Sequence, residues 1–161
     1  MSTSARLAAA EPYGYLSDPA VPAFDDAHAL IVYDGVCVLC SHAMRNIATR
    51  DHNGHFHFAR AQSPLGQALF RHYKIDPVQF ETVLLISNGK AYGKLDMTRE
   101  VARVLGGPWR LFALLRPLPR WLQDKAYDAI AQNRYRLFGR TETCMLPDAS
   151  WRARVIDHSG Q

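Results

Sequence analysis

The hydrophobic pattern is clearest at Ala29–Tyr33 (ALIVY), a continuous run of apolar and mostly branched residues. A short apolar run without alternation is typical of a strand that is buried on both faces of an α/β sheet. Apolar residues then recur at helical spacing from about Val38 to Asp51, and they alternate with polar residues over His55–Ala59. The three segments predict a strand, a helix and a second strand.

A second group of elements follows the same rules. Ser63–Pro64 is typical of a helix start. Ser can cap the helix, and Pro fits the first helical position because the backbone N–H that it lacks would have no partner within the helix. Thr82–Ile86 predicts another apolar strand. Asn88–Gly89 is a hairpin signal, so Lys90–Lys94 is expected to return as the neighbouring strand.

Two further helices are expected toward the C-terminus. Asp96 is predicted to cap a helix that ends at Gly106–Gly107, and a long helix is predicted over Pro119–Phe138. The element order predicts an α/β fold with a thioredoxin-like βαβ–ββα core and extra C-terminal helices. Residues 1–27, with three prolines and no apolar period, predict a flexible or loosely docked N-terminal arm, which leaves 28–161 as the domain with its helical extension.

Composition limits the classes of protein. The 161 residues are 48% hydrophobic, which excludes a disordered chain, and three cysteines are too few for a secreted disulfide scaffold. No apolar run approaches the ~20 residues that span a bilayer, and the first residues lack a secretory core. We therefore expect a cytoplasmic protein in which a close cysteine pair is redox-active, catalytic or metal-binding.

The segment YDGVCVLC places Asp34, Cys37 and Cys40 in the spacing DxxCxxC, between a predicted buried strand and a predicted helix. This is the context of a redox-active CxxC pair. A helix N-terminus favours an anion, so we expect a lowered pKa for Cys37 and attack by its thiolate on a disulfide. Cys40 lies one turn later and can resolve the mixed disulfide. A redox-active disulfide of this kind needs no other cofactor.

Other roles stay open for these residues. Asp34 can accept or relay a thiol proton, or it can cap backbone N–H groups as a turn residue. Cys37 and Cys40 can also be structural thiols, or zinc ligands together with Cys144 and His42, although the chain has no second CxxC. Cys144 by itself fits a small buried apolar residue or a third redox thiol.

The chain resembles the DCC family of predicted thiol-disulfide oxidoreductases, which is named after the DxxCxxC motif. YDGVCVLC matches that motif, FARAQSPLGQAL resembles the family's second strand and Ser-led helix, and AYDAIAQNRYRLFGRTETCMLP matches its C-terminal signature. The resemblance implies a thioredoxin-like domain and disulfide exchange, with Cys37 and Cys40 as the redox pair and Asp34 as the acidic residue. It leaves four signature residues as candidate supporting residues without a settled role: Tyr127, Asn133, Arg134 and Cys144.

Arg134 has two interpretations from the residues alone. It falls on one face of the last predicted helix with Leu122, Ala126 and Ile130, beside an apolar stripe. Its stem can cover the edge of the core while its head reaches water. Alternatively, Asn133–Arg134 packs near the cysteine loop, where it stabilises the Cys37 thiolate or binds an anionic group.

The main hypothesis is a protein-disulfide reductase that acts on a disulfide-containing protein or a small-molecule thiol. The alternative is a non-catalytic module that docks on a membrane or an anionic partner through the basic and apolar region 109–140. A metal-binding CxxC protein is the remaining candidate. Nucleic acid is not expected as a partner, because the chain has no RNP, KH or zinc-finger pattern.

Overall fold

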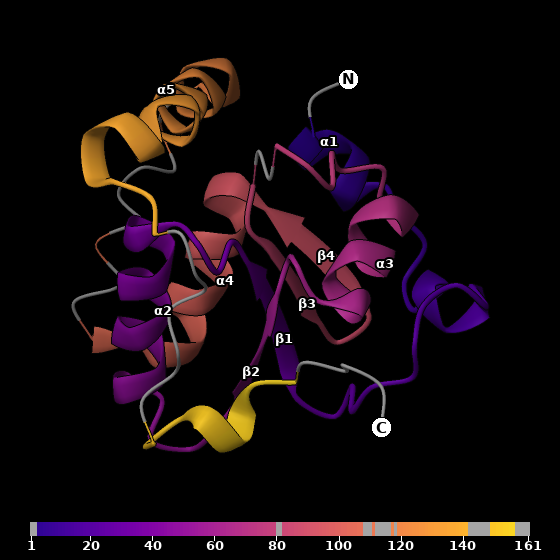
Figure 1. Ribbon diagram of the computed structural model, residues 1–161. Helices are drawn as coiled ribbons and strands as arrows, with labels where there is room; N and C mark the ends of the chain where they lie inside the picture. Colours follow the sequence, from indigo (N-terminus) through magenta and orange to yellow (C-terminus); the bar gives the residue numbers. More distant parts are fainter. Residues whose placement is uncertain are drawn as a thin grey trace.

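The computed structural model describes residues 3–79, 82–107, 111, 117, 119–141 and 149–156. Within them, four strands form one mixed sheet in the order β2-β1-β3-β4 (Figure 1). β1 pairs with β2 in parallel, whereas the β1–β3 and β3–β4 pairs are antiparallel. The strands are β1 (Ala29–Tyr33), β2 (Phe56–Arg60), β3 (Leu84–Ser87) and β4 (Lys90–Gly93). The predicted α/β, thioredoxin-like architecture is confirmed.

Five α-helices accompany the sheet in the described part of the chain: α1 (Thr3–Ala8), α2 (Val38–Arg50), α3 (Pro64–His72), α4 (Lys94–Leu105) and α5 (Arg120–Phe138). α2 and α4 lie against one face of the sheet and α3 lies against the other (Figure 1). α5 packs on α2 and α4 rather than on the sheet. Residues of these three helices, α2, α4 and α5, line a cavity beside the start of α2.

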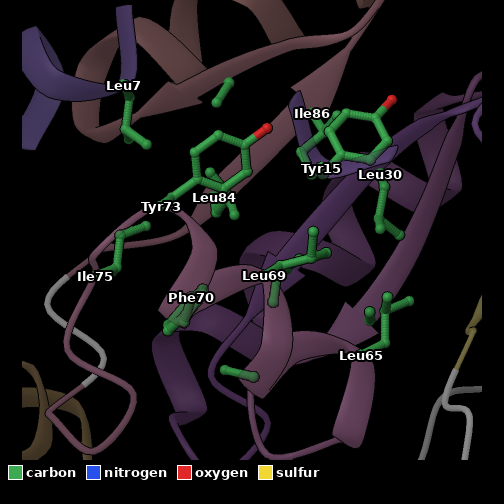
Figure 2. Close-up of a cluster of buried hydrophobic side chains, with 14 residues drawn as sticks. Leu7, Tyr15, Leu30, Leu65, Leu69, Phe70, Tyr73, Ile75, Leu84 and Ile86 are labelled. Atoms are coloured by element: carbon green, nitrogen blue, oxygen red, sulfur yellow. The ribbon is translucent and has the colours of Figure 1, made fainter. Parts of the chain in front are cut away.

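β1 is buried on both faces because its residues alternate between two apolar cores. Leu30 and Val32 belong to the core that contains α3, part of which is shown in Figure 2. Ile31 and Tyr33 belong to the core that contains α2 and α4. All four side chains are at most 1% exposed, so the continuous apolar run predicted this strand correctly.

The local signals of the sequence have clear outcomes. Asn88 and Gly89 both have positive φ, as a two-residue hairpin turn requires. Ser63 caps α3 by accepting a hydrogen bond from the Gly66 N–H at 3.1 Å. The prediction that Asp96 caps α4 was wrong. Gly93 is the N-cap of that helix, and Asp96 forms an ion pair with Arg99 inside the first two turns.

The N-terminal segment, for which the sequence predicts a flexible or loosely docked arm, contacts the sheet. α1 packs on β4, where Leu7 is buried and would meet a Cβ placed on Gly93. Tyr15 is also buried in the core, and its hydroxyl donates to Asp26 at 3.3 Å. These two isolated apolar residues cover one face of the sheet, although they form no periodic pattern in the sequence.

Gly66 allows α3 to approach the end of β2 closely. A Cβ at this position would lie 2.2 Å from the backbone oxygen of Arg60. We expect Gly66→Ala to lower the free energy of unfolding by about 1–3 kcal/mol, because overpacking outweighs the ~1 kcal/mol gain in helix propensity. Urea unfolding measures this. Gly14→Ala is the control, since its Cβ would have only ordinary contacts. Equal midpoints for the two variants would contradict the expectation.

Candidate functional site

The two cysteines occupy the N-terminus of α2, as the sequence predicted. Cys37 is the N-cap residue, and its Sγ accepts a hydrogen bond from the Cys40 backbone N–H at 3.3 Å. Both thiols are free. Cys37 is completely buried, whereas Cys40 is partly exposed. The helix start therefore holds a reduced dithiol with one sulfur accessible and the other covered.

The surroundings of the two thiols separate their pKa values. The Cys40 thiol donates a hydrogen bond to the Cys37 sulfur, and this lowers the pKa of Cys37 from 9.0 to about 7. The same hydrogen bond, followed by burial, raises the pKa of Cys40. Cys37 is consequently the thiolate of the pair near neutral pH, and Cys40 retains its proton.

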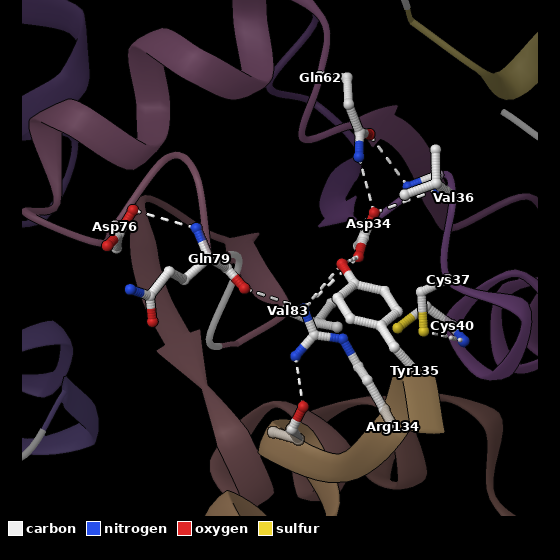
Figure 3. Close-up of polar contacts among 12 residues, drawn as sticks. Asp34, Val36, Cys37, Cys40, Gln62, Asp76, Gln79, Val83, Arg134 and Tyr135 are labelled. Atoms are coloured by element: carbon white, nitrogen blue, oxygen red, sulfur yellow. Dashed lines mark hydrogen bonds and ion pairs between the residues drawn. The ribbon is translucent and has the colours of Figure 1, made fainter. Parts of the chain in front are cut away.

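Asp34 lies directly after β1 and is buried at the centre of a polar network (Figure 3). Its carboxylate accepts hydrogen bonds from the Val36 N–H at 3.2 Å and from Gln62 Nε2 at 2.7 Å. The Tyr135 hydroxyl also donates to it, and the Arg134 guanidinium lies 3.5 Å away. Asp34 therefore organises the turn before the cysteines and connects that turn to α5.

The structure places the head of Arg134 inside the protein, not in water. Only 5% of the residue is exposed. Its guanidinium donates to the backbone oxygens of Ala131 and Gln79 at 2.6 and 3.0 Å. Its charge lowers the pKa of both thiols, although it is a lesser cause of the Cys37 shift. Asn133 does not share this position, because it is exposed and donates to the Ala129 carbonyl on its own helix.

Tyr127 also comes to the site. Its hydroxyl lies 3.5 Å from the Thr82 Oγ1 and from the Val83 N–H, which donates to it, just before β3. Tyr127, Arg134 and Cys40 all line one cavity of about 370 Å³ between α2, α4 and α5. The supporting residues predicted from the C-terminal signature thus divide: Tyr127 and Arg134 reach the site, Asn133 does not, and Cys144 lies outside the described residues.

A short segment after α5 lies against the cysteine loop. Arg140 forms an antiparallel bridge with Cys37. The Thr141 N–H and hydroxyl both donate to the Val36 carbonyl, at 3.0 and 3.2 Å. We call residues 139–141 the strap. It runs beside the backbone of Cys37, the residue whose thiol is buried.

Sequence reasoning missed two residues of the network. Tyr135 stands in the C-terminal signature, but nothing in its pattern indicated a contact with Asp34, 101 positions away. Gln62 donates to Asp34 and accepts from the Gly35 N–H at 3.0 Å. Its position was open to prediction: β1 and β2 are parallel, so polar residues that follow them meet at the same edge of the sheet.

Zinc binding by the cysteines gains no support from the described residues. His42 is exposed on α2, and Cys144 lies outside the described part of the chain. Within that part, the one group of three potential metal ligands is Asp25, His28 and His57. It lies at the opposite end of β1 from the cysteines. The two imidazole rings are stacked, with centroids 4.2 Å apart and planes at 12°, so their lone pairs do not converge on one point.

The region proposed for docking is described only in part. Residues 109–110, 112–116 and 118 lie outside the described residues. α5 exposes Trp121, Leu137 and Phe138, each about half or more accessible. Docking on a membrane or an anionic partner remains a prediction. None of the described helices combines the length and apolar character needed to cross a bilayer.

Known proteins resemble this chain over most of its length. The family described as DCC1-like thiol-disulfide oxidoreductase matches residues 31–140. The uncharacterized protein YuxK of Bacillus subtilis is 38% identical over 127 residues, which cover 79% of this chain and 93% of YuxK. The chloroplastic DCC family protein At1g52590 of Arabidopsis thaliana is 28% identical over 123 residues, covering 76% of this chain and 72% of that protein.

No solved structure matches the chain significantly. The family match runs from within β1 to Arg140 and includes Asp34, the two cysteines and Arg134. The resemblance inferred from the two separated motifs is confirmed, and the chain belongs to the family of DCC1-like thiol-disulfide oxidoreductases.

Proposed function

We propose that the protein is a thiol-disulfide oxidoreductase of the protein-disulfide reductase type, which exchanges disulfides through Cys37 and Cys40. The observation that carries the proposal is the dithiol at the start of α2, where Cys37 is the more acidic thiol and Cys40 holds a proton. A thiolate is the nucleophile in disulfide exchange, and a protonated neighbour can become the resolving thiol. The family assignment supports the same general role.

In the proposed reaction, the Cys37 thiolate attacks one sulfur of a substrate disulfide. The substrate S–S bond breaks, a mixed disulfide forms at Cys37, and the other substrate sulfur leaves as a thiolate that takes a proton from solvent. Cys40 then loses its proton and attacks the Cys37 sulfur. The second substrate sulfur leaves, so the substrate has gained two electrons and the protein holds a Cys37–Cys40 disulfide.

The pKa of Cys37 supports reduction over oxidation of substrates. Its value of about 7 is similar to that of the nucleophilic cysteine of thioredoxin, about 7, and far above that of the strong oxidant DsbA, about 3.5. A very stable thiolate would favour the dithiol form and make the disulfide strongly oxidising. A moderately lowered pKa leaves the dithiol able to give up electrons.

A redox titration tests the proposed function. Thiols are counted on the native protein across a series of glutathione ratios, with Cys37→Ser and Cys144→Ser beside the wild type. We expect a reversible two-electron couple that disappears in Cys37→Ser and persists in Cys144→Ser, and its midpoint distinguishes a reductant from an oxidant. Three thiols that never pair at any ratio would refute the proposal.

The ionisation of Cys37 gives an independent prediction. Because the folded state lowers the pKa of this thiol, the thiolate is expected to appear as the pH rises through about 7 and not through 9.0. The ultraviolet absorbance of the thiolate follows this step without requiring access to the buried sulfur. Cys37→Ser should remove the step. If the first ionisation of the wild type began only near pH 9, the assignment of Cys37 as the thiolate would be wrong.

A further inference from the structure

The cavity beside the cysteines has apolar walls and is formed by three helices. α2 contributes Leu39 and Ala43, α4 contributes Met97 and Val101, and α5 contributes Ile130 and Ala131. Its volume of about 370 Å³ is within the range of small-molecule sites and near its lower limit. The cavity therefore has room for one compact apolar molecule.

The two cysteines differ in their relation to this cavity. Cys40 is part of its lining, and Cys37 is not. Cys37 is fully buried beside the strap, where Arg140 pairs with its backbone. A molecule in the cavity would consequently meet the sulfur of Cys40 first.

Arg134 supplies a polar group to the same cavity. Its two terminal nitrogens donate to protein oxygens, but its Nε is buried and has no hydrogen-bond partner among the described residues. Buried donors without a partner are rare and costly, so this N–H is a place for an acceptor from outside the protein. The cavity thus joins apolar walls, one free N–H donor and an accessible cysteine sulfur.

We propose that this cavity binds a small apolar dithiol that carries a carbonyl or carboxylate oxygen, and that this dithiol reduces the Cys37–Cys40 disulfide by attacking Cys40. The proposal rests on the proposed function, because it names the reductant that restores the dithiol after each exchange. The ligand's hydrocarbon part would contact the apolar walls, and its oxygen would accept from Arg134 Nε.

The electrons balance in two steps. One ligand thiolate attacks the Cys40 sulfur, the Cys37–Cys40 bond breaks, and Cys37 leaves as a thiolate. The second ligand thiolate attacks the ligand sulfur that is now bound to Cys40. The bond to Cys40 breaks, and the Cys40 thiolate leaves and takes a proton. The ligand departs as a cyclic disulfide, having given two electrons to the protein. A dithiol is favoured over two separate thiols because the cavity has room for only one molecule.

Attack at Cys40 is also the favoured direction of bond breaking. In thiol-disulfide exchange the more acidic thiol is the better leaving group. The Cys40 backbone N–H donates to the Cys37 sulfur at 3.3 Å and stabilises the thiolate that leaves when Cys40 is attacked. The exposed sulfur and the better leaving group are therefore arranged for a reductant that enters through the cavity.

Reduction of the isolated, oxidised full-length protein tests the proposal. The probes are dihydrolipoamide, a dithiol with a hydrocarbon chain and an amide oxygen, and dithiothreitol, a polar dithiol. The rates of reduction by the two dithiols are compared at equal thiolate concentration. The readout is the rate with dihydrolipoamide divided by the rate with dithiothreitol. We expect Ala131→Phe, which fills the cavity, to lower this ratio at least about tenfold. Ala129→Phe makes the same change at an exposed position of α5 outside the cavity and should leave the ratio unchanged.

Two further measurements keep the test decisive. Thr98→Phe fills the cavity from α4 if Ala131→Phe does not fold. Octanamide, which has the apolar chain and the amide oxygen but no sulfur, should compete with dihydrolipoamide in the wild type. A ratio that both filling variants leave unchanged, or a lack of competition by octanamide, would overturn the proposal while leaving the proposed function intact. If no Cys37–Cys40 disulfide forms in the redox titration, the proposed function fails and this proposal fails with it.

Discussion

The Cys37→Ser variant is expected to lose disulfide reduction almost completely. A serine hydroxyl is not ionised near neutral pH and cannot form a mixed disulfide, so the rate should fall at least about a thousandfold, to background. The loss should not come from misfolding, because a serine oxygen can still cap α2 by accepting the N–H of residue 40. The assay is the reduction of a model protein disulfide, with urea unfolding as the check on the fold.

The matched variant Cys40→Ser should fail at a different step. Cys37 can still attack, but no second thiol releases the substrate, so a mixed disulfide should accumulate that mass spectrometry detects. Cys144→Ser is the control and should retain the wild-type rate. A Cys37→Ser protein that reduced the substrate at the wild-type rate would rule out this thiol as the nucleophile, and trapping at Cys37→Ser instead of Cys40→Ser would reverse the two roles.

The burial of Cys37 has a consequence for protein substrates. A disulfide that the Cys37 thiolate attacks must come within bonding distance of a sulfur that has no exposed surface. The strap is held beside this residue by the hydrogen bonds of Thr141 to the Val36 carbonyl. Beyond the strap, residues 149–156 pack on β2, where Val155 forms a bridge with Phe58. Attack on a protein disulfide therefore requires the surroundings of the Cys37 sulfur to open, whereas Cys40 also lines the cavity.

The sequence predicted the parts of the fold that depend on local chemistry. The apolar run of β1, the Asn88–Gly89 turn and the Ser63 cap each act within a few residues, and each lies where expected. The start of α4 was misplaced because Lys94 begins the helix with a positive φ, and its N–H donates to Thr82 in a distant segment. Packing by Leu7 and Tyr15 was missed because single apolar residues form no period.

The candidate site was predictable to a similar depth. Asp34, Cys37 and Cys40 lie within one segment of eight residues, YDGVCVLC. The position of this segment between a strand and a helix indicated its chemistry. Residues from other elements could be suggested but not placed. The face of α5 illustrates this: Ile130 lies on the same predicted stripe as Arg134 but is half exposed, whereas Arg134 is buried. Only the packing of α5 on α2 and α4 decides which side chain turns inward.

The Asp34→Ala variant is expected to be the most destabilised single substitution at the site. It leaves the Gln62 amide, the Tyr135 hydroxyl and the Arg134 guanidinium without their shared acceptor. Loss of one partner from a buried ion pair costs about 3–5 kcal/mol, so the free energy of unfolding should fall by about that amount in urea. Asp34→Asn keeps one acceptor oxygen and should cost less. Equal stability of Asp34→Ala and the wild type would mean that the network contributes little to folding.

The pKa of Cys37 separates an electrostatic role of this network from a purely structural one. The Asp34 charge raises the pKa of that thiol and the Arg134 charge lowers it. Asp34→Asn should therefore shift the thiolate absorbance step to lower pH, and Arg134→Met should shift it to higher pH, although both changes destabilise the fold. A structural role alone would give losses of stability with no such opposite shifts. Opposite shifts would show that the buried pair adjusts the acidity of the nucleophile in two directions, while the hydrogen bond from Cys40 makes the largest contribution to the lowered pKa.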